Sequence, residues 1–176
     1  MRTAAFVSLY LGMIVAANYL VTGHPSRAPY IAFAFIGGDL VCRDTLHLAW
    51  HGKRLWRNMA VLIAAGSVLS VIVNRDSSRV ALASCVAFAT AATVDALVFH
   101  WRRNDRWQDR SMLSNVFGAT VDSFVFPLIA FVGLYMTFWS TTFWTLVFTL
   151  ACAKIAGSWV WTHLLGRRAE LAVEPF

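Results

Sequence analysis

The chain has 176 residues, of which 59% are hydrophobic and only 14% are charged, and its formal net charge is +6. Ordinary soluble domains are about 45–50% apolar and about 25% charged, and a single core of this size could not bury so many apolar side chains. The composition therefore excludes a soluble globular domain and predicts an all-α integral membrane protein. The three cysteines lie far apart in apolar stretches, which argues against a disulfide scaffold.

Six stretches are long and apolar enough to cross a bilayer, which takes about 20 residues of helix. They cover residues 3–22, 29–50, 57–74, 79–101, 113–137 and 142–165. The connections are too short for a second domain, so we expect one transmembrane domain over residues 1–176. We expect the first stretch to be a retained helix and not a signal peptide, because it has no convincing cleavage site and five more spans follow.

Basic residues between the spans predict the orientation of the chain. With the N-terminus inside, ten Lys and Arg residues fall in cytoplasmic segments, and three, Arg27, Arg75 and Arg79, fall in the opposite segments. Because cytoplasmic loops carry the basic excess, we expect a multi-pass protein of the inner (cytoplasmic) membrane with both termini in the cytoplasm. This orientation role explains the positive charge without a nucleic-acid partner.

Six charged residues fall inside the spans, where an ion costs at least about 2.5–3.5 kcal/mol and usually faces a protein interior or an aqueous cavity. They are Asp39, Arg43, Asp44, Asp95, Asp122 and Lys154. The helical rise places Asp39, Asp122 and Lys154 near the midplane. It places Arg43 and Asp95 closer to the cytoplasm. We expect Lys154 to pair with Asp122 or Asp39, and Arg43 to pair with Asp95 or Asp39.

Four carboxylates and two cations leave an excess of two negative charges. A proton, a bound cation or a donor-rich substrate is expected to complete the site, and purely structural ion pairs are the alternative. Each half of the chain carries an acid midway along its second span, Asp39 and Asp122. This similarity suggests two inverted three-helix repeats, whose interface is where transporters often bind substrate.

His47, His51 and Asp44 share a helical face with the spacing of metal ligands. Histidines entering the membrane interface are ordinary, however, and we predict no metal ion and no cofactor. Serine nucleophile elbows, ATP-binding loops and metalloprotease signatures are absent from the sequence. We therefore do not expect an enzyme.

Five segments of the sequence carry a family resemblance. They are AANYLV (16–21), AFAFIGGDLVCRD (32–44), SRVALASCVAFATAATVDALVFHWRR (78–103), SMLSNVFGATVDSFVFPLIAF (111–131) and ACAKIAG (151–157). Together they resemble the putative vitamin uptake transporters, the YhhQ-type queuosine-precursor transporter family. The family pattern is matched at Asn18, Asp39, Arg43, Asp95, Ser114, Gly118, Asp122 and Lys154. Ala92 and Ala119 stand where the family pattern has a glutamine and an asparagine.

The resemblance implies a six-helix inner-membrane importer of 7-cyano-7-deazaguanine or its aminomethyl form, precursors of the modified tRNA nucleoside queuosine. A deazaguanine ring offers an N–H and an adjacent amine that one carboxylate can accept, and a carbonyl that needs a donor. We expect Asp39 or Asp122 to accept from the two donors, and phenylalanines near the acids to flank the ring. These aromatic candidates are Phe35, Phe117, Phe124 and Phe126. The predicted substrate-binding residues are Asp39, Arg43, Asp95, Asn115, Asp122, Lys154, Ser114 and Phe35.

Two other functions stay open at this point. The chain could be the substrate-binding subunit of an energy-coupling-factor-type vitamin or nucleobase transporter, or a small intramembrane enzyme that uses His47, His51 and the acids. The expected partners are a purine-like small molecule and the lipid bilayer, and a homo-oligomer and an energising module are left open. The exact base and the energy source, whether a proton gradient, facilitated diffusion or an ATPase, do not follow from the sequence.

Overall fold

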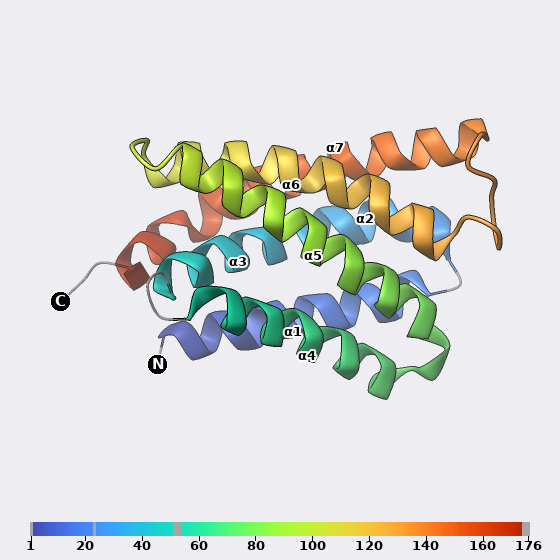
Figure 1. Cartoon of the computed structure of the whole chain (residues 1–176), viewed down its shortest axis with the longest axis horizontal. Coiled ribbons are helices and arrows are strands. Elements are labelled where there is room, and N and C mark those ends of the chain that lie inside the picture. Colours follow the sequence, from blue (N-terminus) through green and yellow to red (C-terminus); the bar gives the residue numbers. More distant parts are fainter. Residues whose placement is uncertain (1, 23, 51–53, 174–176) are drawn as a thin grey trace.

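A computed structural model describes residues 2–22, 24–50 and 54–173, which form a bundle of helices with no strand within these ranges. Successive long helices run in opposite directions, so the first turn of α1 and the last part of α7 lie at the same end of the bundle (Figure 1). The elements are α1 (Arg2–Val21), η1 (Pro25–Arg27), α2 (Ala28–Ile31), η2 (Ala32–Ile36), α3 (Gly37–Ala49), α4 (Leu55–Val73), η3 (Arg75–Ser77), α5 (Ser78–Trp101), α6 (Trp107–Ala130) and α7 (Thr141–Val173).

Five of these helices are long and apolar enough to cross a membrane. The five candidate spans are Thr3–Val21, Leu55–Val73, Ser78–Trp101, Met112–Ala130 and Thr141–Leu165. The segment predicted as a span over 29–50 is also helical, because α2, η2 and α3 follow one another without a break over residues 28–49. Its three charged residues and its division into shorter elements distinguish it from the other five, and the arrangement is compatible with six crossings.

The second segment contains a widened, π-helical turn, η2, directly before Asp39. Here α7 packs against the backbone: a Cβ added to Gly37 would lie 2.5 Å from the carbonyl carbon of Gly157. The indole Nε1 of Trp161 donates a 3.0 Å hydrogen bond to the main-chain carbonyl of Ala34, inside the π turn. Two small residues and one side-chain donor thus let α7 lie against an irregular helix, whose polar backbone must be satisfied within the membrane.

The predicted fifth span, 113–137, is wrong at its C-terminal end. Helix α6 begins at Trp107 and ends at Ala130, and the chain then turns through Gly133, whose φ of +83° is a conformation that favours glycine. The guanidinium of Arg79, at the start of α5, donates to the carbonyl oxygens of Ile129 at 2.9 Å and Val132 at 2.7 Å. A side chain from another helix thus satisfies carbonyl groups at the end of α6, which have no partner along the helix.

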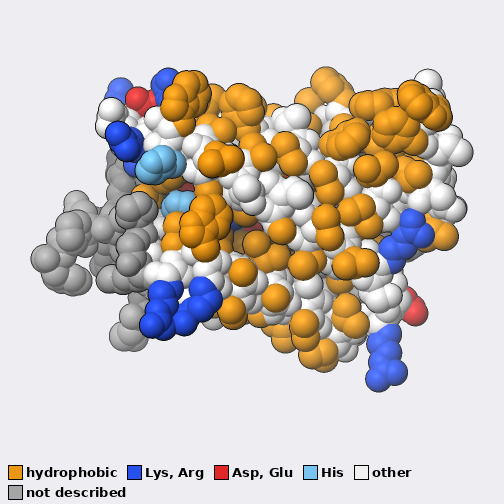
Figure 2. Space-filling view, viewed as in Figure 1, with side chains coloured by type: hydrophobic (Ala, Val, Ile, Leu, Met, Phe, Trp, Pro, Cys, Tyr) orange, Lys and Arg blue, Asp and Glu red, His pale blue; other side chains and the backbone are white. Residues whose placement is uncertain are grey.

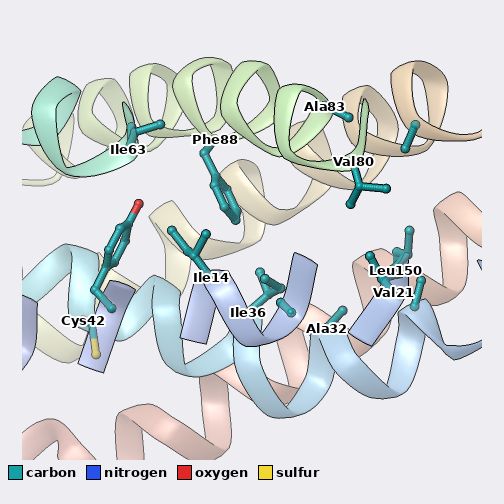
Figure 3. Packing of buried hydrophobic residues seen from close by; sticks show 14 of the residues in the cluster. Ile14, Val21, Ala32, Ile36, Cys42, Ile63, Val80, Ala83, Phe88 and Leu150 are labelled. Atoms are coloured by element: carbon teal, nitrogen blue, oxygen red, sulfur yellow. The ribbon is translucent and has the colours of Figure 1, made fainter. Parts of the chain in front are cut away.

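The hydrophobic core lies where α1 and the second segment face α4, α5 and α7. Phe88 projects from α5 toward Ile14 of α1 and Ile36 of η2, and all three side chains are buried (Figure 3). Small core residues such as Ala83 and Ala32 let the neighbouring helices approach closely.

The outer surface is apolar between two polar ends, as Figure 2 shows for the face formed by α4 and α5. Large side chains on these two helices point outward, among them Val61, Ile72, Leu82 and Leu97, which are 59–71% exposed. Such a surface is stable against lipid and not against water. The chain is therefore a multi-pass membrane protein.

Candidate functional site

All six charged residues predicted inside the spans are buried in the bundle. Their exposed fractions are 1% for Asp39, 2% for Arg43, 1% for Asp44, 2% for Asp95, 3% for Asp122 and 3% for Lys154. They come from α3 and from the three consecutive helices α5, α6 and α7, so four helices contribute buried charges to the interior of the bundle. Charges this deep in a membrane protein require compensation from one another or from a ligand.

Two ion pairs form between neighbouring helices. Arg43 of α3 pairs with Asp95 of α5, with 3.2 Å between Nη2 and Oδ1, and Lys154 of α7 pairs with Asp122 of α6. Each cation thus forms an ion pair with one of the two acids that were predicted for it from its depth in the membrane. The ammonium of Lys154 also lies 5.9 Å from the centre of the Phe126 ring, so an aromatic face adds to its compensation.

Asp39 is the predicted partner that neither cation takes. Both of its carboxylate oxygens are buried, and neither has a hydrogen-bond partner within the described part of the chain. Arg43, Asp122 and Lys154 are near enough to interact electrostatically with this carboxylate. Asp39 is therefore a buried acceptor whose hydrogen-bonding capacity is not used by the described residues, although its side chain lines neither of the cavities described below.

The remaining predicted site residues divide into two groups. Asn115 donates from Nδ2 to Oδ2 of Asp44 at 3.1 Å, and Ser114 beside it is fully buried, so both lie in the polar interior on α6. Phe35 of η2 is only half-buried and packs against the hydrophobic core, away from the lining of the two cavities described next. The role of Phe35 in a binding site stays a prediction.

A small cavity of about 30 Å³ borders the Lys154–Asp122 pair. Asn18 of α1 and Ser84 of α5 complete its polar lining, and its aromatic lining consists of Phe88 of α5 and Phe126 of α6. About 10–15 Å³ suffices for one water molecule, so this cavity has the size of about two waters. A purine-sized ring enters here only if the helices separate.

A larger cavity of about 170 Å³ borders the other ion pair, Arg43–Asp95. It lies between α3, α4 and α5, and its lining includes His47 and Trp56. The space-filling view shows a hollow on the α4–α5 face near histidine side chains, at one end of the bundle (Figure 2). Four of the predicted binding residues thus line these two cavities, Asp122 and Lys154 the smaller one and Arg43 and Asp95 the larger one, whereas Asp39, Ser114, Asn115 and Phe35 line neither.

The other aromatic candidates are dispersed. Phe117 is 47% exposed on the outer surface, and Phe124 packs edge to face with Phe138 and Phe143 in a cluster beside the α6–α7 connection. Of the four phenylalanines predicted to flank a ring, Phe126 alone lines either of these two cavities.

A polar contact that joins three helices was not predicted from the sequence. Asn18 Nδ2 donates to Ser70 Oγ at 2.9 Å, and Ser84 Oγ donates to Asn18 Oδ1 at 2.6 Å. Tyr10 was also missed, although it is 1% exposed and interacts electrostatically with Asp39. Asn18 and Tyr10 are polar side chains within the first predicted span, and this position in the membrane is the signal that could have revealed them.

The helical face of His47, His51 and Asp44, for which no metal ion was predicted, is described only in part. His51 lies outside the described residues, and His47 contacts the Phe99 ring with 5.4 Å between ring centres. Within residues 2–22, 24–50 and 54–173, no three His, Cys, Asp or Glu side chains gather as metal ligands would.

The sequence model of a family described as "Putative vitamin uptake transporter" matches residues 55–165. This range includes α4 and α5, the membrane span of α6, and α7 up to Leu165, and thus Asp95, Asp122 and Lys154. No curated protein and no solved structure matches the chain.

Proposed function

Since the chain belongs to the putative vitamin uptake transporter family, we propose that it imports a 7-deazaguanine precursor of queuosine, in the cyano or the aminomethyl form. In this proposal the protein lies in the inner membrane with both termini in the cytoplasm. The buried polar residues of α3, α5, α6 and α7 form the transport pathway.

The observation that carries the proposal is the state of Asp39. A carboxylate that is 1% exposed, with no hydrogen bond to either oxygen, is costly unless something donates to it during the protein's work. A deazaguanine edge supplies two adjacent donors, an N–H and an amine, which match the two oxygens. A ligand without these donors would leave the carboxylate unsatisfied, so the same residue would provide selectivity.

The hollows in the structure support a route along the bundle. At the end of the bundle opposite Arg54, an open depression of about 380 Å³ is lined by Ser26, Pro29 and Thr145 among others. The small cavity beside Asp122 follows at greater depth, and the larger cavity beside Asp95 lies beyond it. The narrow middle, beside the Lys154–Asp122 pair, separates the two wider spaces. In alternating access such a central site opens to one side of the membrane at a time.

Uptake of radiolabelled 7-cyano-7-deazaguanine by proteoliposomes that contain only this chain tests the proposal. We expect saturable uptake that falls at least tenfold in Asp39→Asn and Asp122→Asn, and that is unchanged in Asp76→Asn, an exposed control. Undiminished uptake in both buried variants would refute this assignment of the site. Uptake that needs added ATPase subunits would instead identify a binding subunit of a larger transporter.

A further inference from the structure

We infer that the 170 Å³ cavity between α3, α4 and α5 is the pocket that holds the base in this conformation, with the ring edge against Arg43 and Asp95. The inference rests on the proposed function and adds to it the position, the orientation and the recognition groups of the ligand. Asp39 and Asp122, the acids of the proposed central site, do not line this cavity, so the inference adds a second position for the base along the proposed route and leaves the contact with Asp39 to the central site.

The inner wall of the cavity is charged and its rim is apolar. Arg43 and Asp95 are 2% exposed, and Met59 beside them is 6% exposed. At the rim, Trp56 is 61% exposed and Ala60 is exposed as well. A ligand that enters between α4 and α5 therefore passes from an apolar mouth to a charged end.

The charged end has unused hydrogen-bonding capacity. Although Arg43 and Asp95 are 3.2 Å apart, the three guanidinium nitrogens and Asp95 Oδ1 have no hydrogen-bond partner within the described part of the chain. Behind the pair lies Gly118 of α6: a Cβ there would be in ordinary van der Waals contact, 3.4 Å from both Arg43 Nη2 and Asp95 Cβ. The pair is thus supported from α6 on one side and borders the cavity on the other.

A guanidinium beside a carboxylate complements one particular ring edge. Arg43 offers only donors and ionised Asp95 only acceptors, so the matching edge carries a carbonyl next to an N–H and an amine. Guanine and 7-deazaguanines have this acceptor–donor–donor order, whereas adenine does not, and hypoxanthine lacks the amine. The ligand class is therefore a neutral, flat ring system with a guanine-type edge.

The volume fits this orientation. A cavity of about 150 Å³ binds benzene, so a space of about 170 Å³ encloses one six-membered ring. The fused five-membered ring and its substituent then lie at the mouth, beside the Trp56 side chain. A substituent outside the enclosed part explains how one pocket would accept both a cyano and an aminomethyl group.

A matched pair of substitutions on α4 tests the position of the ligand. Ala60 and Ala64 are both exposed and one helical turn apart, but only Ala60 lines the cavity. We expect purified Ala64→Phe to bind 7-cyano-7-deazaguanine like the wild type and Ala60→Phe to bind it at least tenfold more weakly, measured with labelled ligand. Equal binding by the two variants would overturn the inference and leave the proposed function intact. A wild-type protein that binds neither this base nor guanine would overturn both.

A second experiment tests whether Asp95 accepts from the amine of the ring. It measures, for one protein at a time, the ratio of the affinities for guanine and hypoxanthine. The wild type should bind guanine at least tenfold more tightly than hypoxanthine, because the missing amine leaves a carboxylate oxygen of Asp95 without its donor. In Asp95→Asn this ratio should fall toward one, whatever fraction of the protein is folded. An unchanged ratio in Asp95→Asn would show that another group reads the amine.

Discussion

Gly37 of α3 and Gly157 of α7 meet backbone to backbone, so closely that a Cβ on Gly37 would lie 2.5 Å from the carbonyl carbon of Gly157. Neither helix can retreat without moving Asp39 or Lys154, which lie two and three residues away. We therefore expect Gly37→Ala to destabilise the protein by about 1–3 kcal/mol through overpacking, despite the better helix propensity of alanine. Thermal unfolding of the purified protein in detergent measures the effect.

The matched control for this substitution is Gly12→Ala. Gly12 is also helical, but a Cβ there would have nothing within 4 Å, so only the propensity gain of up to about 1 kcal/mol remains. A Gly37→Ala protein as stable as Gly12→Ala would mean that the two helices are not held in contact.

The Lys154–Asp122 pair makes a second prediction. Removing one partner leaves a buried charge uncompensated, which costs about 3–5 kcal/mol, so Lys154→Met and Asp122→Asn should each lower stability strongly. The double variant carries neither charge and should regain most of the loss, while uptake stays abolished. Denaturant unfolding of all four proteins gives the coupling energy. A double variant as unstable as the sum of the singles would show that the pair does not form.

The sequence predicted the helical class and most helix ends within two residues, because length and hydropathy suffice for a membrane helix. It missed the end of α6, because residues 131–137 are as apolar as a span. The helix ends because the chain turns at Gly133 and because Arg79, from another helix, donates to a carbonyl oxygen at the helix end. The π turn of η2 likewise depends on Gly157 and Trp161, more than 110 residues away.

For the site, the helical rise predicted how deep each charged side chain lies in the membrane, but not the direction in which it points around the helix axis. Depth correctly gave the two candidate acids for each cation, and the rotation of each helix about its axis decided between them. The same missing rotation left the packing of Phe35 against the core unpredicted. It also hid the contact of Asn18 with Ser84, which requires two helices to face each other.

This contact of α1, α4 and α5 makes a third prediction. Asn18→Ala removes the amide that accepts a hydrogen bond from Ser84 Oγ and donates one to Ser70 Oγ inside the bundle. The free energy of unfolding should therefore fall by about 1–3 kcal/mol. The exposed Asn104→Ala should have no measurable effect. If the loss comes from hydrogen bonds and not from volume, Ser84→Ala in the Asn18→Ala background should cost less than it does alone. Equal costs in the two backgrounds would argue against the hydrogen bond.

The orientation of the chain in the membrane makes the last prediction. Asn104 lies between α5 and α6 beside Arg102, Arg103 and Arg106, whereas Asp76 lies at the opposite end of α5. The basic excess predicts that the Asn104 end is cytoplasmic. In a chain whose native cysteines are replaced by alanine, an impermeant maleimide should label Asp76→Cys in right-side-out vesicles. It should label Asn104→Cys only after permeabilisation. The reverse pattern would contradict the proposed orientation and would place the cavity beside Arg43 on the outer side of the membrane.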